Sequence, residues 1–215
     1  LAQPFLDETS FAGTNYYFYD LNAKANYRFS DEDRLYFSTY FGRDVLQFRS
    51  NARDFNFDMP YGNATATLRW NHLFSDKLFM NVSGVYNDYD FGFRGGQGDF
   101  RISLDSGVRD WNGKVDLEYF PNPRHHLRFG GNYTYHQLTP SLASAANGEE
   151  VFANEADIRY AHEGALYLAD ELKIGSSVML NAGLRVSAFT QLGPYTSKLD
   201  STQYESGTPV KTYVG

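Results

Sequence analysis

Cysteine is absent from this sequence of 215 residues. A disulfide framework and a thiolate metal site are therefore excluded. Long apolar runs are missing as well, and no stretch approaches the roughly 20 apolar residues that a transmembrane helix needs. The mean hydropathy of −0.50 agrees with this, so the chain is not a helical membrane protein.

Basic residues are scarce. Lysine and arginine total 19 against 26 aspartates and glutamates, which gives a formal net charge of −7. Phosphate backbones are bound by clustered lysine and arginine, and no such cluster occurs here. We therefore expect no nucleic-acid partner.

What the sequence does contain is a repeated alternation of polarity. It is clearest in residues 19–29 and returns in 63–71 and 110–119. Successive side chains of a β-strand point to opposite faces, so each segment predicts a strand with one apolar and one polar face. In the first segment the apolar phase holds Tyr19, Leu21, Ala23, Ala25, Tyr27 and Phe29, and the polar phase holds Asp20, Asn22, Lys24, Asn26 and Arg28.

Four short polar turns, at 30–34, 75–77, 121–125 and 175–177, each join two such segments. Long segments near 44–62, 89–107, 138–156 and 192–215 separate the resulting hairpins and are predicted as irregular loops. The sequence thus predicts eight antiparallel strands, at 17–29, 35–43, 63–73, 78–88, 108–120, 126–137, 157–172 and 178–190.

A regular exchange of short and long connections is typical of outer-membrane β-barrels, whose short turns face the periplasm and whose long loops face outside. Crossing that membrane takes about 9–11 tilted residues, which the predicted strands supply. Aromatic residues, 17% of the chain, gather near both ends of the strands, as interfacial girdles do. The expected fold class is all-β, an antiparallel meander of about eight transmembrane strands, in the bacterial outer membrane and in contact with its lipid.

The turn rule also predicts that both ends of the chain lie outside the cell. Complete bacterial barrels have an even number of strands and keep both ends in the periplasm. Residues 1–15 show no alternation and no signal peptide, and the last residues form a polar tail. We therefore expect residues 1–215 to be an internal section of a larger barrel, without a plug domain.

Several local segments resemble TonB-dependent outer-membrane receptors. The segments are 163–172 (EGALYLADEL), 180–185 (LNAGLR), 89–93 (YDFGF), 106–112 (SGVRDWN) and 133–140 (YTYHQLTP). They are most similar to receptors that carry a carboxypeptidase-regulatory-like domain before the plug. The resemblance implies import of a scarce nutrient, such as a siderophore, cobalamin, a glycan or a peptide. It further implies a plug domain and TonB as partners, through parts of a receptor that this chain does not contain.

Ten charged residues fall on the polar phase of their strands, and in a wide barrel this phase lines the lumen. They are candidates for contact with a ligand or plug, although polar lumen walls are general and the same residues can simply be solvated or paired with neighbours. These candidates are Lys24, Arg28, Arg69, Lys114, Asp116, Glu118, Arg128, His136, Glu163 and Arg185.

Enzymatic, metal-binding and cofactor-binding functions receive little support. Ser83, Ser187, His136 and His162 do not pair a nucleophile with a base in sequence. His125 and His126 would diverge to opposite faces of a strand, and oxygen-ligand cages need tighter spacing than the acidic loop residues have. We expect no catalytic residue, metal site or cofactor.

Two other architectures remain open. A self-contained structural or adhesive barrel of eight strands would pair the first strand with the last. A soluble lipocalin-like carrier would instead turn Tyr19, Leu21 and Ala23 toward its interior.

Overall fold

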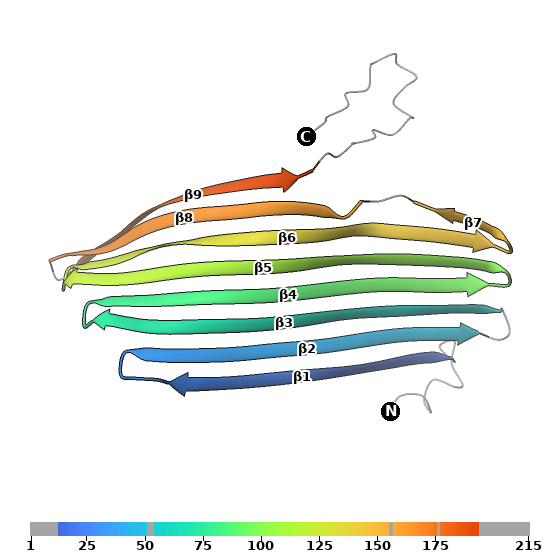
Figure 1. Ribbon diagram of the computed structural model, residues 1–215, viewed down its shortest axis with the longest axis horizontal. Helices are drawn as coiled ribbons and strands as arrows, with labels where there is room; N and C mark the ends of the chain where they lie inside the picture. Colours follow the sequence, from blue (N-terminus) through green and yellow to red (C-terminus); the bar gives the residue numbers. More distant parts are fainter. Residues whose placement is uncertain (1–12, 51–53, 155–156, 176, 194–215) are drawn as a thin grey trace, which may run out of the picture.

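The computed structural model describes residues 13–50, 54–154, 157–175 and 177–193, and its regular structure is entirely β-strand (Figure 1). The strands form one nine-stranded antiparallel sheet in the order β1-β2-β3-β4-β5-β6-β8-β9, with β7 paired to β6. The predicted fold class, an all-β antiparallel meander, is confirmed. The strands are β1 (Thr14–Arg28), β2 (Asp33–Ser50), β3 (Phe55–Ser75), β4 (Leu78–Gln97), β5 (Phe100–Asn122), β6 (His125–Asn147), β7 (Glu150–Ala153), β8 (Arg159–Ile174) and β9 (Val178–Leu192).

The four predicted short turns are confirmed, and they lie together at one end of the sheet (Figure 1). Polar side chains close three of them by accepting backbone hydrogen bonds. The Ser30 hydroxyl accepts from the N–H of Asp33 at 3.0 Å, and the Asn122 side-chain oxygen accepts from the N–H of Arg124 at 2.9 Å. Ser75 accepts from Lys77 in the same way at 3.3 Å. These residue types mimic a backbone turn, which explains why the sequence reverses there.

The prediction of long irregular loops at 44–62, 89–107 and 138–156 is wrong. In the described residues of these ranges the strands continue: β4 and β5 meet at the turn of Gly98 and Asp99, and β6 and β7 meet at Gly148 and Glu149. Both glycines come first in their turns and have positive φ, at 56° and 60°, as two-residue type II′ turns require. Pairing the strands satisfies backbone N–H and C=O groups that loops of this length would leave to water. The fourth predicted loop, 192–215, lies outside the described residues from 194 onward.

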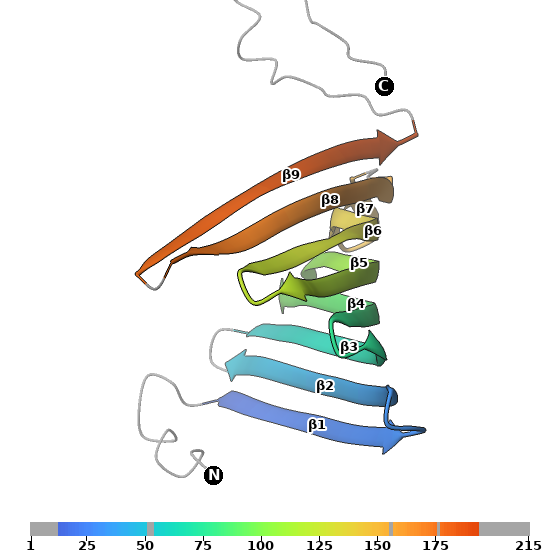
Figure 2. The same ribbon diagram turned by 90° about the vertical axis from the view of Figure 1, so that its left-hand side faces the viewer.

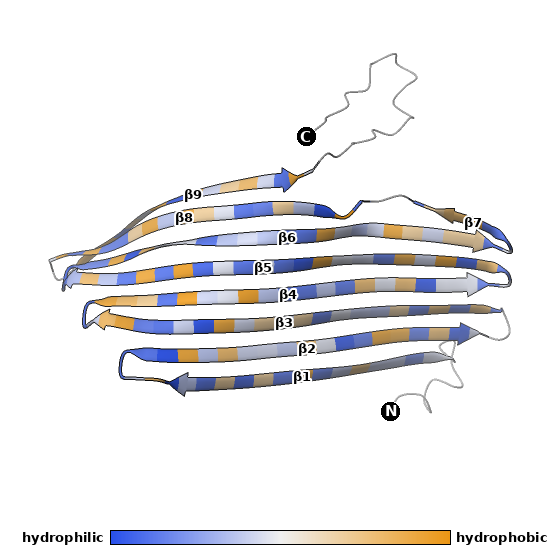
Figure 3. Ribbon diagram, viewed as in Figure 1, coloured by the Kyte–Doolittle hydropathy of each residue, from blue (hydrophilic) through white to orange (hydrophobic). Residues whose placement is uncertain are grey.

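The strands are therefore longer than predicted. β5 and β6 have 23 residues each, about 75 Å at 3.3 Å per residue, against the 9–11 residues that a membrane crossing needs. We call the part near the four short turns proximal and the part near the Gly98 and Gly148 turns distal. Figure 3 shows the alternation of hydrophilic and hydrophobic residues along the strands.

The sheet does not close on itself. β1 and β9 form its two edges, seven strand-to-strand steps apart. Figure 2 shows that strand direction changes steadily from β1 to β9, the twist expected of a sheet of L-residues. No pairing of β1 with β9 occurs among the described residues, although the self-contained eight-stranded barrel requires it.

The described residues include no helix with the length and apolar character that a membrane crossing requires.

Candidate functional site

One face of the proximal half carries a continuous apolar surface, which we call the band face. Register places Leu21, Phe41 and Ala64 side by side on β1 to β3. It likewise aligns Val82 with Val115 on β4 and β5. These side chains are well exposed where they are large, for example Leu21 at 64% and Leu184 on β9 at 71%. An exposed apolar surface of this extent marks an interaction site.

The band ends distally in a row of aromatic rings on β4, β5, β6 and β8. Tyr86 lies 5.6 Å from Trp111 between ring centroids, Trp111 lies 5.7 Å from Tyr135, and Tyr135 stacks on Tyr160 at 5.9 Å. We call these four rings the aromatic row. Amphipathic rings of this kind gather where an apolar environment meets water.

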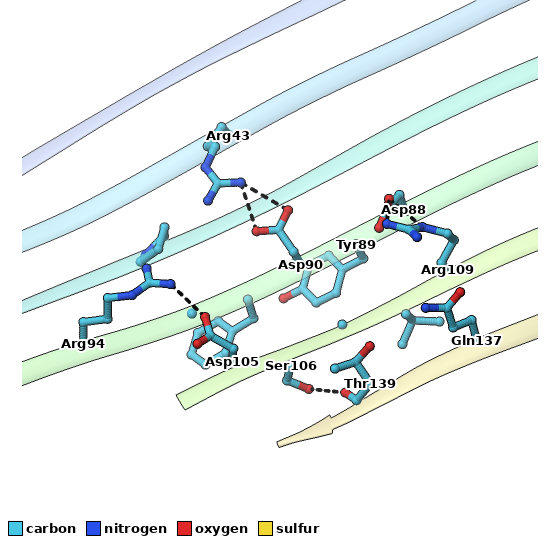
Figure 4. Close-up of a pocket in the computed structure, with 15 residues that line it drawn as sticks. Arg43, Asp88, Tyr89, Asp90, Arg94, Asp105, Ser106, Arg109, Gln137 and Thr139 are labelled. Carbon is cyan, nitrogen blue, oxygen red and sulfur yellow. Dashed lines mark hydrogen bonds and ion pairs between the residues drawn. The ribbon is translucent and has the colours of Figure 1, made fainter. Parts of the chain in front are cut away.

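Beyond the aromatic row the band face becomes charged (Figure 4). Nη1 of Arg43 lies 2.9 Å from Asp90, Nη2 of Arg109 lies 2.7 Å from Asp88, and Nη2 of Arg94 lies 2.9 Å from Asp105. The hydrogen bond that Arg109 donates to Asp88 raises the pKa of the guanidinium, which therefore stays charged. These six residues form what we call the charged patch. They lie around a hollow of about 210 Å³.

The sequence placed Asp90, Arg94 and Asp105 in a predicted loop and Arg43, Asp88 and Arg109 at the ends of predicted strands, so the charged patch was missed. The alternation that continues through Asp88, Asp90, Gly92 and Arg94 was the available signal. This alternation was obscured because its charged side chains occupy the positions that are apolar earlier in the same strand.

The opposite face of the proximal half is polar, and it holds the predicted lumen residues. Several pair with one another: Nζ of Lys114 lies 3.0 Å from Asp116, and Nη2 of Arg185 donates to Asn132 at 3.0 Å. The Tyr167 hydroxyl also donates to Asp116, reaching across Gly130. A lattice of polar contacts therefore links β5, β6, β8 and β9.

His136 of β6 adds a second link between β5 and β8 in this lattice. Its Nδ1 lies 2.8 Å from Asp110, and its Nε2 lies 3.5 Å from Glu163. Nε2 is buried and makes no hydrogen bond. The structure thus brings the predicted residues His136 and Glu163 together, and adds Asp110, which the sequence did not single out.

The other predicted residues lie apart from this center of the lattice. Arg28 pairs with Asp31 in the first turn, and Glu118 accepts from His126 at 2.9 Å. Lys24, Arg69 and Arg128 lie on the same polar face, and within the described part of the chain their side chains make no ion pair or hydrogen bond. Contact of any of the ten with a ligand or plug stays a prediction.

On this opposite face the distal half turns aromatic. Phe48 and Phe57 stack at 5.6 Å, Phe57 stacks on Phe93 at 6.0 Å, and Phe55 lies 6.0 Å from both Phe48 and Phe57. The two faces therefore exchange polarity at the aromatic row. The band face is apolar over the proximal half alone. Only this half of the sheet is therefore suited to an apolar environment.

The chemistry of the histidines follows from their partners. His125 contacts Asp170 at 2.7 Å, while His126 contacts Glu118, so the two adjacent rings diverge. His162 contacts the Tyr133 hydroxyl. Among the described residues, no three His, Asp or Glu side chains are grouped so as to hold a metal ion.

Comparison with known proteins defines the class of fold. No family model matches the sequence, and no curated protein does. Among solved structures the chain is similar to BauA, the ferric preacinetobactin receptor from Acinetobacter baumannii, with a TM-score of 0.55 and 10% sequence identity. The match covers 86% of this chain and 35% of that receptor, so this chain spans about a third of the receptor's length. The likeness shows the fold alone, an antiparallel β-sheet.

Proposed function

We propose that this chain forms part of the barrel wall of a TonB-dependent outer-membrane receptor that imports a scarce nutrient. The observation that carries the proposal is the band face, an exposed apolar surface on an open antiparallel sheet, bounded by the aromatic row. Lipid is the surrounding that such a surface fits, because transmembrane strands place apolar side chains outward between aromatic girdles. The fold likeness to a ferric-siderophore receptor and the sequence resemblance to TonB-dependent receptors support the same class.

In this arrangement the opposite face lines the lumen. Its polar lattice over the proximal half suits a water-filled or plug-filled interior, as wide transporters have. The cluster of Phe48, Phe55, Phe57 and Phe93 lies on the same face distally, where a nutrient would enter from outside. Siderophores, cobalamin, glycans and peptides are all candidate ligands, and plug and TonB would act through other parts of the receptor.

The rival function, a self-contained structural barrel, is disfavoured by the open edges of the sheet. A soluble lipocalin-like carrier is disfavoured by the exposure of the apolar face and by the polar residues of the opposite one.

Accessibility of single cysteines in intact cells tests the membrane arrangement, because the chain has no cysteine of its own. Phe152→Cys, in the distal strand β7, is expected to react with a membrane-impermeant maleimide added outside. Asp76→Cys, in a proximal turn, is expected to react only after the outer membrane is permeabilised. Leu68→Cys, in the band, serves as the lipid-shielded control. Reaction of Asp76→Cys in intact cells would contradict the orientation.

Import is tested separately. Cells that express a receptor containing this chain are expected to accumulate one of a panel of labelled siderophores, cobalamin, oligosaccharides and peptides, and an uncoupler of the proton gradient is expected to abolish this accumulation. Equal accumulation with and without that receptor, for every compound, would rule out import of these compounds.

A further inference from the structure

The band face carries two hollows of opposite chemistry close together. The first, about 510 Å³, is apolar and lies over Gly84 and Gly113, with Phe37, Leu68 and Tyr133 among its walls. Gly84 and Gly113 face each other in the ladder, and a Cβ at either would meet nothing within 4 Å. The absence of two side chains therefore opens a groove in an otherwise continuous apolar surface.

The second hollow lies in the charged patch, just beyond the aromatic row. Arg109 precedes Gly113 by four residues on the same face of β5, about 13 Å along the strand. Trp111, on the same face, lies between them and lines the groove. An elongated molecule with an apolar part and a charged part could thus contact both hollows at once.

Glycines keep the ion pairs of the charged patch flat against the sheet. Arg43 on β2 reaches Asp90 on β4 across Gly62 of β3. A Cβ at Gly62 would lie 3.3 Å from both Nη1 of Arg43 and Oδ1 of Asp90. Gly92 lies in the same way below the Arg94–Asp105 pair. The guanidinium groups therefore form the exposed floor of the hollow.

The charge of this surface suits an anion. The distal part of the band face carries five arginines and four aspartates, whereas the whole chain has a net charge of −7. A guanidinium has five N–H donors, and Arg43 uses only Nη1 in its ion pair, so donors remain for a further acceptor. Arginine binds phosphate in a bidentate manner, which lysine cannot do. The five arginines are Arg43, Arg49, Arg94, Arg101 and Arg109, and the four aspartates are Asp58, Asp88, Asp90 and Asp105.

We propose that the band face binds a lipid with a phosphorylated headgroup. An acyl chain lies in the groove over Gly84 and Gly113, and the phosphate contacts Arg43 and Arg109 in the charged patch. The site is continuous with the lipid-facing surface, so this inference rests on the proposed function. The occupant is a membrane lipid because the two hollows together require an apolar chain and an anion in one molecule.

Native mass spectrometry of the purified protein, titrated with lipid A, tests the proposal. Lipid A is expected to bind about tenfold more tightly than its dephosphorylated form. Arg43→Gln with Arg109→Gln is expected to remove this preference. The matched control is Arg34→Gln with Arg69→Gln, which removes the same charge from the opposite face and is expected to leave it intact. Gly84→Leu fills the groove and is expected to weaken both forms.

Equal affinity for the two lipids, or a preference for lipid A that survives the Arg43→Gln and Arg109→Gln substitutions, would overturn the site. So would an affinity for both lipids that Gly84→Leu leaves unchanged. A fourth contrary result is competition by inorganic phosphate that is as strong as that of lipid A. The last would assign the patch to free anions. Arg43→Lys with Arg109→Lys retains the charges and is expected to fold if the glutamine pair does not, with a weaker preference for lipid A. Equal affinity for lipid A and its dephosphorylated form, combined with a Leu68→Cys that stays shielded in cells, would reject this site. The proposed function would still stand.

Discussion

Single glycines decide how closely neighbouring strands approach one another in this sheet. Gly130 of β6 lies between Asp116 of β5 and Tyr167 of β8, and the Tyr167 hydroxyl crosses it to reach the carboxylate. A Cβ at Gly130 would clash with the backbone oxygen of Val115 and would lie 2.8 Å from the Tyr167 hydroxyl. A backbone oxygen cannot move aside as a side chain can, so the strands themselves would have to part.

We therefore expect Gly130→Ala to lower the free energy of unfolding by about 2–3 kcal/mol. Gly113→Ala is the matched control, because its Cβ meets nothing within 4 Å, and it is expected to be neutral or to stabilise by about 0.5–1 kcal/mol. Urea unfolding of the protein in vesicles measures both. Equal effects of the two substitutions would refute the crowding at Gly130.

Asp33, at the start of β2, anchors the first turn to the neighbouring hairpin. Its carboxylate accepts from Nε1 of Trp70 at 2.9 Å and contacts Nδ1 of His72 at 2.7 Å. The hydrogen bond from His72, followed by that from Trp70, lowers the pKa of Asp33 below its ordinary value of 3.8. The carboxylate form is thus favoured in the folded protein.

A lowered pKa in the folded state adds stability at pH values above 3.8, and this stability is lost as the pH falls through the folded-state pKa. We expect the unfolding midpoint to fall on acidification below about pH 4, and Asp33→Asn to weaken that dependence. Unfolding curves between pH 2 and 6 check this for both proteins. An identical pH profile for the Asn variant would show that other carboxylates control the transition.

At the scale of the strand, the exchange of polarity between faces sets the boundary of the membrane. From Leu78 to Tyr86 the band face of β4 is apolar or glycine, and from Asp88 onward it is charged. The segment from Leu78 to Tyr86 spans nine residues, which matches the 9–11 residues of a membrane crossing. The distal half of each long strand therefore extends beyond the lipid in the proposed arrangement.

The two tryptophans of the chain report on this directly, because both lie on the band face, Trp70 at 39% and Trp111 at 41% exposure. In vesicles of brominated phosphatidylcholine we expect the fluorescence of each, isolated by Trp70→Phe or Trp111→Phe, to be strongly quenched. The control is Asn22→Trp, on the opposite face, in a protein in which Trp70 and Trp111 are both replaced by Phe. Its fluorescence is expected to be quenched by aqueous acrylamide and not by the brominated lipid. Stronger acrylamide quenching of Trp111 than of the control would contradict the assignment of the faces.

At the scale of the whole molecule, the open edges distinguish a wall section from a small closed barrel. Seven steps of about 4.8 Å separate β1 from β9, so spin labels on cysteines at Ala23 and Ala188 are expected about 30 Å apart. Labels at Ala23 and Thr39, which pair directly in the ladder, provide the short-distance control. Pulsed electron resonance on the protein in vesicles measures both. A distance below about 10 Å between Ala23 and Ala188 would indicate closure.

Much of this fold is determined by local sequence. Alternation at period two, as in residues 19–29, requires a strand with one apolar face, and the turn residues Ser30, Ser75 and Asn122 stop the strands where their side chains can bond to the backbone. The strand order follows as well, since short turns leave antiparallel neighbours adjacent. These local rules predicted the all-β meander, all four proximal turns and the polar face that holds Lys114, His136 and Glu163.

The distal half was decided by tertiary structure. There the phases invert: charges such as Arg43 and Asp90 take the phase that was apolar, while Phe48 and Phe57 take the phase that was polar. Such a segment shows no constant apolar phase along its length, so its sequence resembles a loop, and only pairing with its neighbours makes it a strand.

Contacts between strands far apart in sequence likewise decided the sites. The Arg43–Asp90 pair joins residues 47 positions apart, and Tyr167 reaches Asp116 across 51. The sequence by itself determined which residues form strands and which face is apolar over the proximal half, because those properties depend on neighbours along the chain. Register across the sheet determined which charges meet and how far the wall extends, because the geometry of the ladder is set only when all strands are assembled.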